Sequence, residues 1–303
     1  MDNIKINEFL IDSLNKQYGE KISKEILEGY KCKRYTTLRI NTLKASKEEV
    51  FNELDSLGII YEQNELFADA LIIKNKSSKE MIELELCKMG KIYLQSLSSQ
   101  LPAILLNPKQ SSDILDMCAS PGSKTTYLAQ IVKNNAFITA CEVDKIRMER
   151  LKANVSKQGV TCVNFICIDS RKLDDYFRFD QILLDAPCSG SGTLSIYDKS
   201  MTKFSKALVY NSSKLQFELL KKALTILKPG CEMIYSTCSI LDFENEEVLN
   251  KILKVTNCEI VSFNDDIKKH LHLLPTKIDG TLCIKPDEYF EGFFVARIRK
   301  INK

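Results

Sequence analysis

The spacing of hydrophobic and polar residues changes along the chain and predicts two kinds of architecture. Apolar residues at roughly helical spacing predict a helix within residues 1–30. Alternation predicts a strand over 37–42, a helical pattern over 47–57 ends at Gly58, and 70–73 has the pattern of another strand. A further segment leads from Gly90 into a short apolar helix. The first third of the chain therefore predicts a small α+β unit.

From Asp113 onward, predicted strands and helices alternate. Short apolar runs predict strands over residues 114–117, 136–142, 163–168, 181–184 and 233–236. Helical patterns cover 127–132, 146–159 and 215–227, the last stopped by Pro229 and Gly230. This alternation is typical of a doubly wound parallel sheet, whose ligands bind at the carboxyl ends of the strands. We expect residues 1–88 to form the α+β unit and residues 89–303 the α/β domain.

The composition is that of a globular protein and does not identify a ligand. The 303 residues are 44% hydrophobic and 27% charged, as in ordinary globular proteins, and a net charge of +3 permits a nucleic-acid ligand without requiring one. The eleven cysteines are an odd number, residues 1–7 are polar, and apolar residues 9–11 are too few for a signal peptide. We therefore expect a reduced, cytoplasmic protein without a membrane span. Zinc is disfavoured, because no Cys-x-x-Cys pair exists and the histidines are His270 and His272.

The loop after the first α/β strand, residues 116–125, reads Asp-Met-Cys-Ala-Ser-Pro-Gly-Ser-Lys-Thr. Small residues that open a helix let backbone N–H groups approach a ligand closely. A nucleotide P-loop is rejected, because Ser123 precedes Lys124 where that motif has a glycine, and no glycine stands at the motif's upstream position either. A dinucleotide fingerprint fails for want of glycines.

Carboxylates follow the next two predicted strands. Glu142 ends one strand, where it could accept hydrogen bonds from both hydroxyls of a ribose, although a solvated strand-end charge fits its position equally well. Asp144 is expected to cap the following helix. Asp169 ends the third strand, where a carboxylate could receive an adenine amine. Together these side chains favour a nucleoside cofactor without identifying it.

Two cysteines follow the last two predicted strands of the parallel sheet. One strand runs into Asp185-Ala186-Pro187-Cys188-Ser189-Gly190, and the other into Ser236-Thr237-Cys238-Ser239. Free cysteine is most often a small buried hydrophobe, but a turn after a strand is a poor place for a core residue. Because neighbouring parallel strands end at the same edge, we expect both thiols beside the Asp185 carboxylate over one pocket.

These motifs resemble those of the RsmB/NSUN family of RNA cytosine-C5 methyltransferases. The resemblance is carried by residues 116–125, 185–190 and 235–239, and it extends over most of the chain in the family's order. Further matching segments are Arg39-Ile40-Asn41-Thr42-Leu43-Lys44, Tyr93-Leu94-Gln95 with Ser98-Ser99, and Glu291-Gly292-Phe293-Phe294-Val295-Ala296-Arg297. One departure is the loop sequence Ala-Ser-Pro-Gly-Ser, where the family commonly has Ala-Ala-Pro-Gly-Gly. Both changes exchange one small residue for another.

The resemblance implies a Rossmann-like, S-adenosylmethionine-dependent enzyme that forms 5-methylcytidine. It implies Cys238 as the nucleophile toward carbon 6, Asp185 as the group that hydrogen-bonds the base, and Cys188 as the residue that assists release. Lys124 is expected to orient Asp185, to polarise the base or to form a structural salt bridge. The implied cofactor contacts are Cys118, Ala119, Ser120, Pro121, Gly122, Ser123, Lys124, Glu142, Asp169 and Asp185.

The same motifs separate this interpretation from its rivals. DNA cytosine-C5 methyltransferases use the Cys of the Pro-Cys motif as nucleophile and lack the Thr-Cys thiol. Amino-group methyltransferases commonly carry an Asp/Asn-Pro-Pro-aromatic loop, which is absent. A non-catalytic RNA-binding scaffold would be favoured by loss of Asp185, Cys188 or Cys238, and all three are present.

The expected partner is RNA with an unstacked cytosine, and ribosomal RNA is favoured over tRNA. We expect the N-terminal unit to bind RNA and the protein to be a monomer without a metal. The candidate RNA contacts are Arg39, Asn41, Lys44, Lys199, Lys203 and Lys206.

Overall fold

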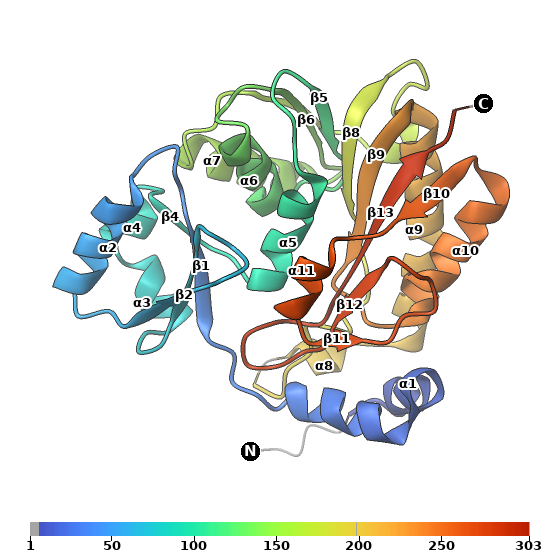
Figure 1. The fold of residues 1–303 in the computed structure, drawn as a ribbon, viewed down its shortest axis with the longest axis horizontal. Helices are drawn as coiled ribbons and strands as arrows, with labels where there is room; N and C mark the ends of the chain where they lie inside the picture. The colour runs from blue at the N-terminus through green and yellow to red at the C-terminus, as the bar shows by residue number, and fades with distance from the viewer. Residues whose placement is uncertain (1–5, 198, 303) are drawn as a thin grey trace. The chain divides into compact units, whose positions relative to one another are not determined.

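The described residues of the computed structural model, 6–197 and 199–302, form two compact units (Figure 1). The first unit combines the described part of residues 1–34 with residues 184–303, and the second comprises residues 35–183. The expected division after residue 88 stays a prediction. Within the first unit, the N-terminal helix packs on the C-terminal segments: the Tyr18 hydroxyl donates to the Ile240 oxygen at 2.6 Å, and the Tyr30 hydroxyl donates to the Ser191 oxygen at 2.7 Å.

An antiparallel sheet with the order β2-β3-β1-β4 forms one half of the second unit. Its elements are β1 (Thr36–Ile40), α2 (Lys47–Ser56), β2 (Tyr61–Gln63), β3 (Ala70–Ile73), α3 (Ser78–Ile82), α4 (Glu85–Lys88) and β4 (Ile92–Leu94). The predicted strands at 37–42 and 70–73 and the predicted helix at 47–57 are confirmed as β1, β3 and α2. The short elements β2, α3 and α4 were not predicted.

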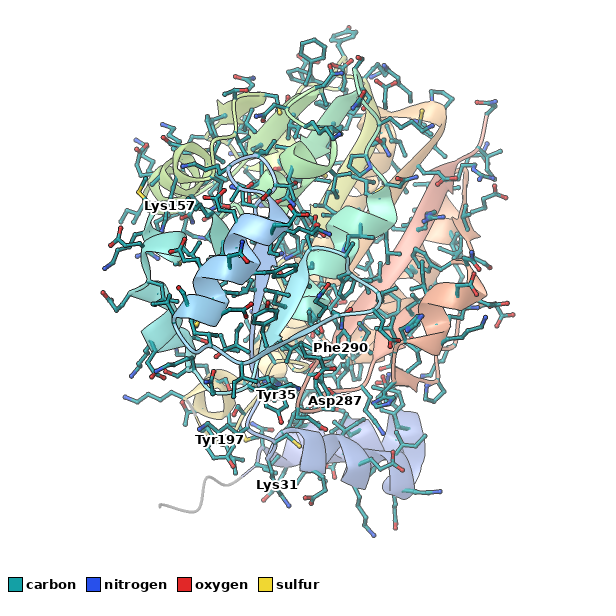
Figure 2. The ribbon with its side chains drawn as sticks, turned by 60° about the vertical axis from the view of Figure 1, so that its left-hand side comes forward. Lys31, Tyr35, Lys157, Tyr197, Asp287 and Phe290 are labelled. Carbon is teal, nitrogen blue, oxygen red and sulfur yellow. The ribbon has the colours of Figure 1, made fainter. Side chains whose placement is uncertain are left out.

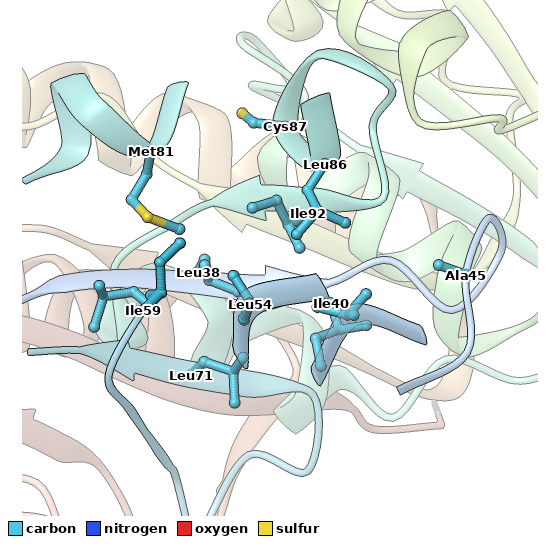
Figure 3. Packing of buried hydrophobic residues seen from close by; sticks show 12 residues of the cluster. Leu38, Ile40, Ala45, Leu54, Ile59, Leu71, Met81, Leu86, Cys87 and Ile92 are labelled. Carbon is cyan, nitrogen blue, oxygen red and sulfur yellow. The ribbon is translucent and has the colours of Figure 1, made fainter. Parts of the chain in front are cut away.

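Local chemistry explains why helix α2 forms where it does. The Ser46 side chain accepts a hydrogen bond from the Glu49 N–H at the first turn, and Gly58 adopts a φ of 64° just past the last turn. Val50 and Leu54, four residues apart, are fully buried on one face. They join the apolar core of this sheet, seen in Figure 3. The core consists of Leu38, Ile40, Ala45, Val50, Leu54, Ile59, Leu71, Ile73, Met81, Leu86, Cys87 and Ile92.

The other half of the second unit is the predicted parallel α/β arrangement. Strand β5 pairs in parallel with β6 and with β8, and β6 pairs in parallel with β7. The elements are α5 (Leu97–Leu106), β5 (Asp113–Asp116), α6 (Ser123–Ile131), β6 (Phe137–Cys141), α7 (Lys145–Lys157), β7 (Val163–Ile166), the 3₁₀ helix η1 (Ser170–Lys172) and β8 (Phe179–Asp185). Strand β8 continues into the first unit at Leu184.

The first unit contains strands that pair antiparallel. Strand β13 lies antiparallel to β9, β12 and β10, and β12 is antiparallel to β11. The elements are α1 (Glu8–Gly29), α8 (Ser200–Lys203), α9 (Lys206–Ile226), β9 (Leu227–Thr237), the 3₁₀ helix η2 (Asp242–Glu244), α10 (Glu246–Val255), β10 (Cys258–Val261), α11 (Asp265–Lys269), β11 (Leu273–Leu274), β12 (Leu282–Ile284) and β13 (Phe293–Lys300). The parallel pattern was predicted only as far as β9, and the later strands are antiparallel, so the sheet is mixed.

Two further boundaries in the first unit differ from their predictions. Helix α9 begins at Lys206 instead of residue 215, because the Ser205 side chain caps it by accepting from the Leu208 N–H. It ends at Ile226, so Pro229 and Gly230 lie in β9 and do not stop the helix. Residues 1–5 of the predicted first helix lie outside the described residues.

The loop before β13 is closed by Asp287, which is labelled with Phe290 in Figure 2. The Asp287 carboxylate accepts hydrogen bonds from the N–H groups of Tyr289 at 2.8 Å and Phe290 at 2.7 Å. These bonds satisfy backbone donors in a turn and hold the approach to the strand.

We predict that Leu54→Ala lowers the free energy of unfolding by about 2–5 kcal/mol, because it removes buried methyl groups and leaves a cavity. Urea denaturation followed by circular dichroism measures the change. The matched control is Leu57→Ala at the end of the same helix, where Leu57 is 49% exposed. That change should stay within about 0.5 kcal/mol. Equal losses in the two variants would contradict the assignment of the core.

Candidate active site

The first unit brings Cys188 and Cys238 together. The N–H of Ala186, just past β8, donates to the oxygen of Ser236 in β9 at 2.8 Å, so the ends of the two strands lie side by side. Cys188 and Cys238 follow these strand ends, and their Sγ atoms are 3.0 Å apart. Both thiols are free and half-buried. The predicted juxtaposition of the two thiols is confirmed.

The surroundings of the Cys188 thiol disfavour its ionisation. The hydrogen bond to Cys238 raises the pKa of the Cys188 thiol well above its usual value, and burial and the negative charge of nearby groups, including Glu244, act in the same direction. Cys188 therefore keeps its proton at neutral pH. A protonated Cys188 can donate a hydrogen bond to the Cys238 sulfur.

A carboxylate stands at the end of β8 in the same unit. Asp185 is half-buried, and its Oδ1 accepts a hydrogen bond from the Ser236 hydroxyl at 2.8 Å. Ser236 is fully buried, so this bond restricts the Asp185 side chain. Sequence reasoning had missed the role of Ser236.

The second unit contains the loop that follows β5. The Asp116 carboxylate accepts from the Thr125 hydroxyl at 2.7 Å, which ties the end of β5 to helix α6. Gly122 has a φ of 106°, and a Cβ there would lie 2.9 Å from a Leu151 methyl group. The positive φ favours a glycine at this turn, and a larger residue would also require the Leu151 side chain to shift. Lys124 donates to the Ser99 hydroxyl at 2.9 Å.

Glu142 follows β6 directly and Asp169 lies three residues after β7, and both are engaged in ion pairs. Glu142 is only 4% exposed, so it is not a solvated strand-end charge; it accepts from the Asp144 N–H at 3.0 Å and lies 3.3 Å from the Arg147 guanidinium. The Asp144 side chain accepts from the Arg147 N–H, which confirms the predicted cap. Asp169 pairs with Arg171 at 2.6 Å, and this hydrogen bond lowers the pKa of Asp169.

The phosphate contact expected of Arg39 is at odds with its burial. Arg39 is fully buried in the second unit, where it donates to Gln95 at 3.3 Å, to Thr126 at 3.0 Å and to Gln130. Its guanidinium also lies 4.4 Å from the centre of the Tyr127 ring. Burial lowers the pKa of Arg39 to about 10, which leaves it charged at neutral pH. The side chain thus joins β1 to helix α6 instead of facing solvent.

Asn41 is buried as well. Its amide donates to the oxygens of Gly90 at 2.8 Å and Gln158 at 2.9 Å, which connects the end of β1 to two loops of the second unit. The expected RNA contact by Asn41 is therefore also at odds with the structure. Lys44 and Lys203 are different, since Lys203 is exposed on α8 and the exposed Lys44 ammonium donates to backbone oxygens of Met89 and Lys157.

Among the described residues, 6–197 and 199–302, no group of three or more His, Cys, Asp or Glu side chains could hold a metal ion. In that same part of the chain, no helix is both long enough and apolar enough to cross a membrane.

A solved structure defines the class of fold. A methyltransferase homologue from Pyrococcus horikoshii is 29% identical and matches with a TM-score of 0.82 over 98% of this chain and 100% of that chain. The fold is that of the Rossmann-like methyltransferases, with a mixed sheet and an N-terminal ferredoxin-like part. Two family models match: one described as 16S rRNA methyltransferase RsmB/F over residues 103–299, and one described as the RsmF/B-like ferredoxin-like domain over residues 6–79. The chain belongs to the RsmB/F methyltransferase family.

Two relatives illustrate the range of the family. A probable ribosomal RNA small subunit methyltransferase B of Bacillus subtilis is 30% identical over 97% of this chain and 66% of its own length. A tRNA (cytosine(49)-C(5))-methyltransferase of Pyrococcus abyssi is 34% identical over 87% of this chain and 88% of its own length. The chain thus spans just under two thirds of the Bacillus protein and most of the Pyrococcus protein.

We predict that Arg39→Lys lowers the free energy of unfolding by about 1–3 kcal/mol. One ammonium group cannot donate hydrogen bonds to all of the acceptors that the guanidinium reaches, namely Gln95, Thr126 and Gln130. Urea denaturation measures this loss. Lys44→Arg, at an exposed position, should change stability by no more than about 0.5 kcal/mol. A stable Arg39→Lys protein that has lost affinity for RNA would instead restore a phosphate-binding role to Arg39.

Proposed function

We propose that this protein is an RNA methyltransferase that converts cytidine to 5-methylcytidine with S-adenosylmethionine as methyl donor. The observation that carries the proposal is the pair of free thiols, Cys188 and Cys238, with Sγ atoms 3.0 Å apart. Methylation at carbon 5 needs one nucleophile to activate the ring and other groups to assist release, and a carboxylate to hold the base. Asp185, at the end of the adjoining strand, supplies the carboxylate. The names of the relatives support the same chemistry.

Cys238 is the proposed nucleophile. Its thiolate adds to carbon 6 of cytosine, and the new Sγ–C6 bond makes carbon 5 enamine-like and reactive. The Asp185 carboxyl group hydrogen-bonds the ring at N3 and the exocyclic amine, which stabilises charge as the adduct forms. Its bond to Ser236 restricts the orientation in which it does so.

Cys188 assists the last step. After carbon 5 has been methylated, water accepts the proton from that carbon, the C5–H electron pair forms the C5–C6 double bond, and the Sγ–C6 bond breaks, which restores the aromatic ring. The departing sulfur of Cys238 regains negative charge. A protonated Cys188 stabilises that charge through the hydrogen bond that joins the two thiols.

The proposed cofactor contacts are the loop residues Cys118–Lys124, together with Glu142, Asp169 and Asp185. When bound, S-adenosylmethionine supplies an electrophilic methyl group. The buried Glu142 fits a ribose, because its carboxylate is held by the Asp144 N–H and Arg147. Asp169 is the weaker candidate, since Arg171 already engages its carboxylate.

We propose ribosomal RNA as the substrate, and residues 1–88 as a segment that contributes to RNA binding. Exposed Lys44 and Lys203 remain candidate phosphate contacts. Tyr197, labelled in Figure 2 and 62% exposed, lies in the same segment as Lys203 and offers a ring for base stacking. tRNA is the second candidate, because the Pyrococcus tRNA enzyme is covered over 88% of its length. We further propose that the protein acts in the cytoplasm as a monomer without a metal.

The decisive experiment incubates transcribed ribosomal and transfer RNAs with the protein and methyl-labelled cofactor. We expect labelled 5-methylcytidine with the wild type, and neither product nor covalent complex with Cys238→Ala. We expect Cys188→Ala to accumulate a protein–RNA adduct, seen as a slow band on a denaturing gel. Mapping the labelled cytidine within the RNA identifies the substrate.

Cys231→Ala serves as the matched control, because Cys231 is another half-buried thiol of β9 outside the cysteine pair. It should retain activity. An adduct that survives loss of Cys238 would reverse the two roles. Tight RNA binding by the wild type without any methyl transfer would indicate a non-catalytic scaffold.

We also predict that Glu142→Gln weakens binding of S-adenosylmethionine about tenfold, roughly 1.4 kcal/mol, because the amide is a poorer acceptor for ribose hydroxyls. Isothermal titration calorimetry measures the affinity. Glu149→Gln, an exposed change on α7, should leave the affinity unchanged. Unaltered binding by a folded Glu142→Gln protein would remove Glu142 from the cofactor site.

A further inference from the structure

Glu244 is a fully buried carboxylate that the proposed chemistry does not use. It ends the short 3₁₀ helix η2, a few residues after Cys238. Its Oε1 accepts from the Ser189 N–H at 2.7 Å and from the Gln216 amide at 3.4 Å. Its Oε2 accepts from the hydroxyls of Ser189 at 2.5 Å and Ser239 at 2.6 Å. One side chain thus collects hydrogen bonds from three segments of the first unit.

The two serines identify what Glu244 connects. Ser189 follows Cys188 directly and Ser239 follows Cys238 directly, so the carboxylate bridges the two cysteine loops. Further bonds brace the same junction. The Ser191 and Ser239 hydroxyls are 2.8 Å apart, and the Gly192 N–H donates to the Cys238 oxygen at 2.9 Å.

Asn245 strengthens the second loop. Its Oδ1 accepts from the Thr237 hydroxyl at 2.6 Å, and its Nδ2 donates to the Ser239 oxygen at 2.9 Å. Thr237 and Ser239 flank Cys238 on both sides. Both ends of the Asn245 amide are engaged by this loop, and the side chain makes no cap hydrogen bond to α10, the helix that it precedes.

Burial of Glu244 has an energetic cost that its surroundings offset. Burial raises the pKa of Glu244, and the bonds from Ser189 and Ser239 oppose that rise. All of these donors are uncharged, so the carboxylate is stabilised by hydrogen bonds instead of an ion pair. Hydrogen bonds to a charged acceptor are stronger and more directional than neutral ones. An apolar residue could fill this space but could not hold two loops at a set distance.

We propose that Glu244 is a positioning residue that holds the Cys188 and Cys238 loops together and so sets the separation of the two thiols. The consequence for catalysis rests on the proposed function, but the consequence for thiol geometry does not. Loss of the bridge should let the loops separate and reduce the rate of any reaction that needs both sulfurs in contact.

The first test measures thiol geometry without RNA or cofactor. Diamide takes two electrons and two protons from a thiol pair, which leaves a disulfide and the reduced hydrazine. Peptide mapping by mass spectrometry follows the Cys188–Cys238 disulfide over time. We expect Glu244→Gln to slow its formation at least about tenfold. An unchanged rate in folded Glu244→Gln protein would overturn the proposal.

Glu246→Gln is the matched control. Glu246 is also buried, lies two positions further along the chain, and accepts from the Lys277 N–H at 3.4 Å instead of from a cysteine loop. It should lose stability on substitution while the disulfide forms at the wild-type rate. Equal slowing in both variants would mean that Glu244 acts only through general stability, which contradicts the proposal.

A second measurement connects geometry to catalysis. With RNA substrate, Glu244→Gln should lower kcat about tenfold or more and leave KM for RNA and cofactor affinity nearly unchanged, because the hydrogen bonds of the buried carboxylate go to protein groups. A loss confined to KM would contradict the positioning role. If the wild type methylates no RNA, the proposed function fails, while the disulfide rates still decide the role of Glu244.

Ser239→Ala keeps the test decisive if Glu244→Gln does not fold. This change removes one arm of the bridge and leaves the carboxylate in place. Slower disulfide formation in Ser239→Ala supports the proposal, and a wild-type rate overturns it.

Discussion

The hydrogen bond from the Ala186 N–H to the Ser236 oxygen aligns the ends of β8 and β9, and the chemistry of the first unit depends on this alignment. Each strand continues into a short turn that carries a cysteine. Because the strand ends are aligned, the two turns begin side by side, and the Cys188 and Cys238 thiols come into contact. The same alignment lets Ser236 donate to Asp185, so one pair of strands positions two thiols and a carboxylate.

Alignment of strands alone leaves the turns free to move, and buried polar side chains remove that freedom. Glu244 and Asn245 have no exposed surface, yet their hydrogen bonds reach both cysteine loops. Such groups are costly to bury unless their donors and acceptors are paired. In the first unit these buried polar groups lie at the junction of the two cysteine loops, and their paired hydrogen bonds offset the cost of desolvation there.

Arg39 shows the same principle in the second unit. A guanidinium with no exposed surface joins β1 to α6 through Thr126 and Gln130, between the rings of Tyr93 and Tyr127. Arg39 lies in a segment that resembles the family's N-terminal motif, and the sequence alone predicted it to contact RNA. The type and order of residues in a motif do not distinguish a side chain that holds the fold from one that holds a ligand. That distinction depends on burial, which is a property of the folded chain.

Periodicity along the chain was sufficient to predict the strands and helices with long or regular patterns, from β1 and α2 to the parallel strands β5 to β8. It missed short elements such as α3, α8 and β11, because a few residues do not establish a period. It placed the start of α9 at residue 215 instead of Lys206, and it interpreted Pro229 and Gly230 as a helix stop, whereas the chain had already entered β9 at Leu227. The antiparallel direction of β13 was also missed, since a buried strand has the same hydrophobic pattern in either direction.

The sequence by itself determined the family, the loop that follows β5 and the identity of the two cysteines, because these depend on short motifs whose residue types carry the chemistry. Only the tertiary structure decided that the thiols are 3.0 Å apart, that Cys188 holds its proton and that Glu244 bridges their loops. It also decided that Arg39 and Asn41 are internal. The physical reason is that distance, burial and pKa arise between residues far apart in sequence, and no local pattern encodes them.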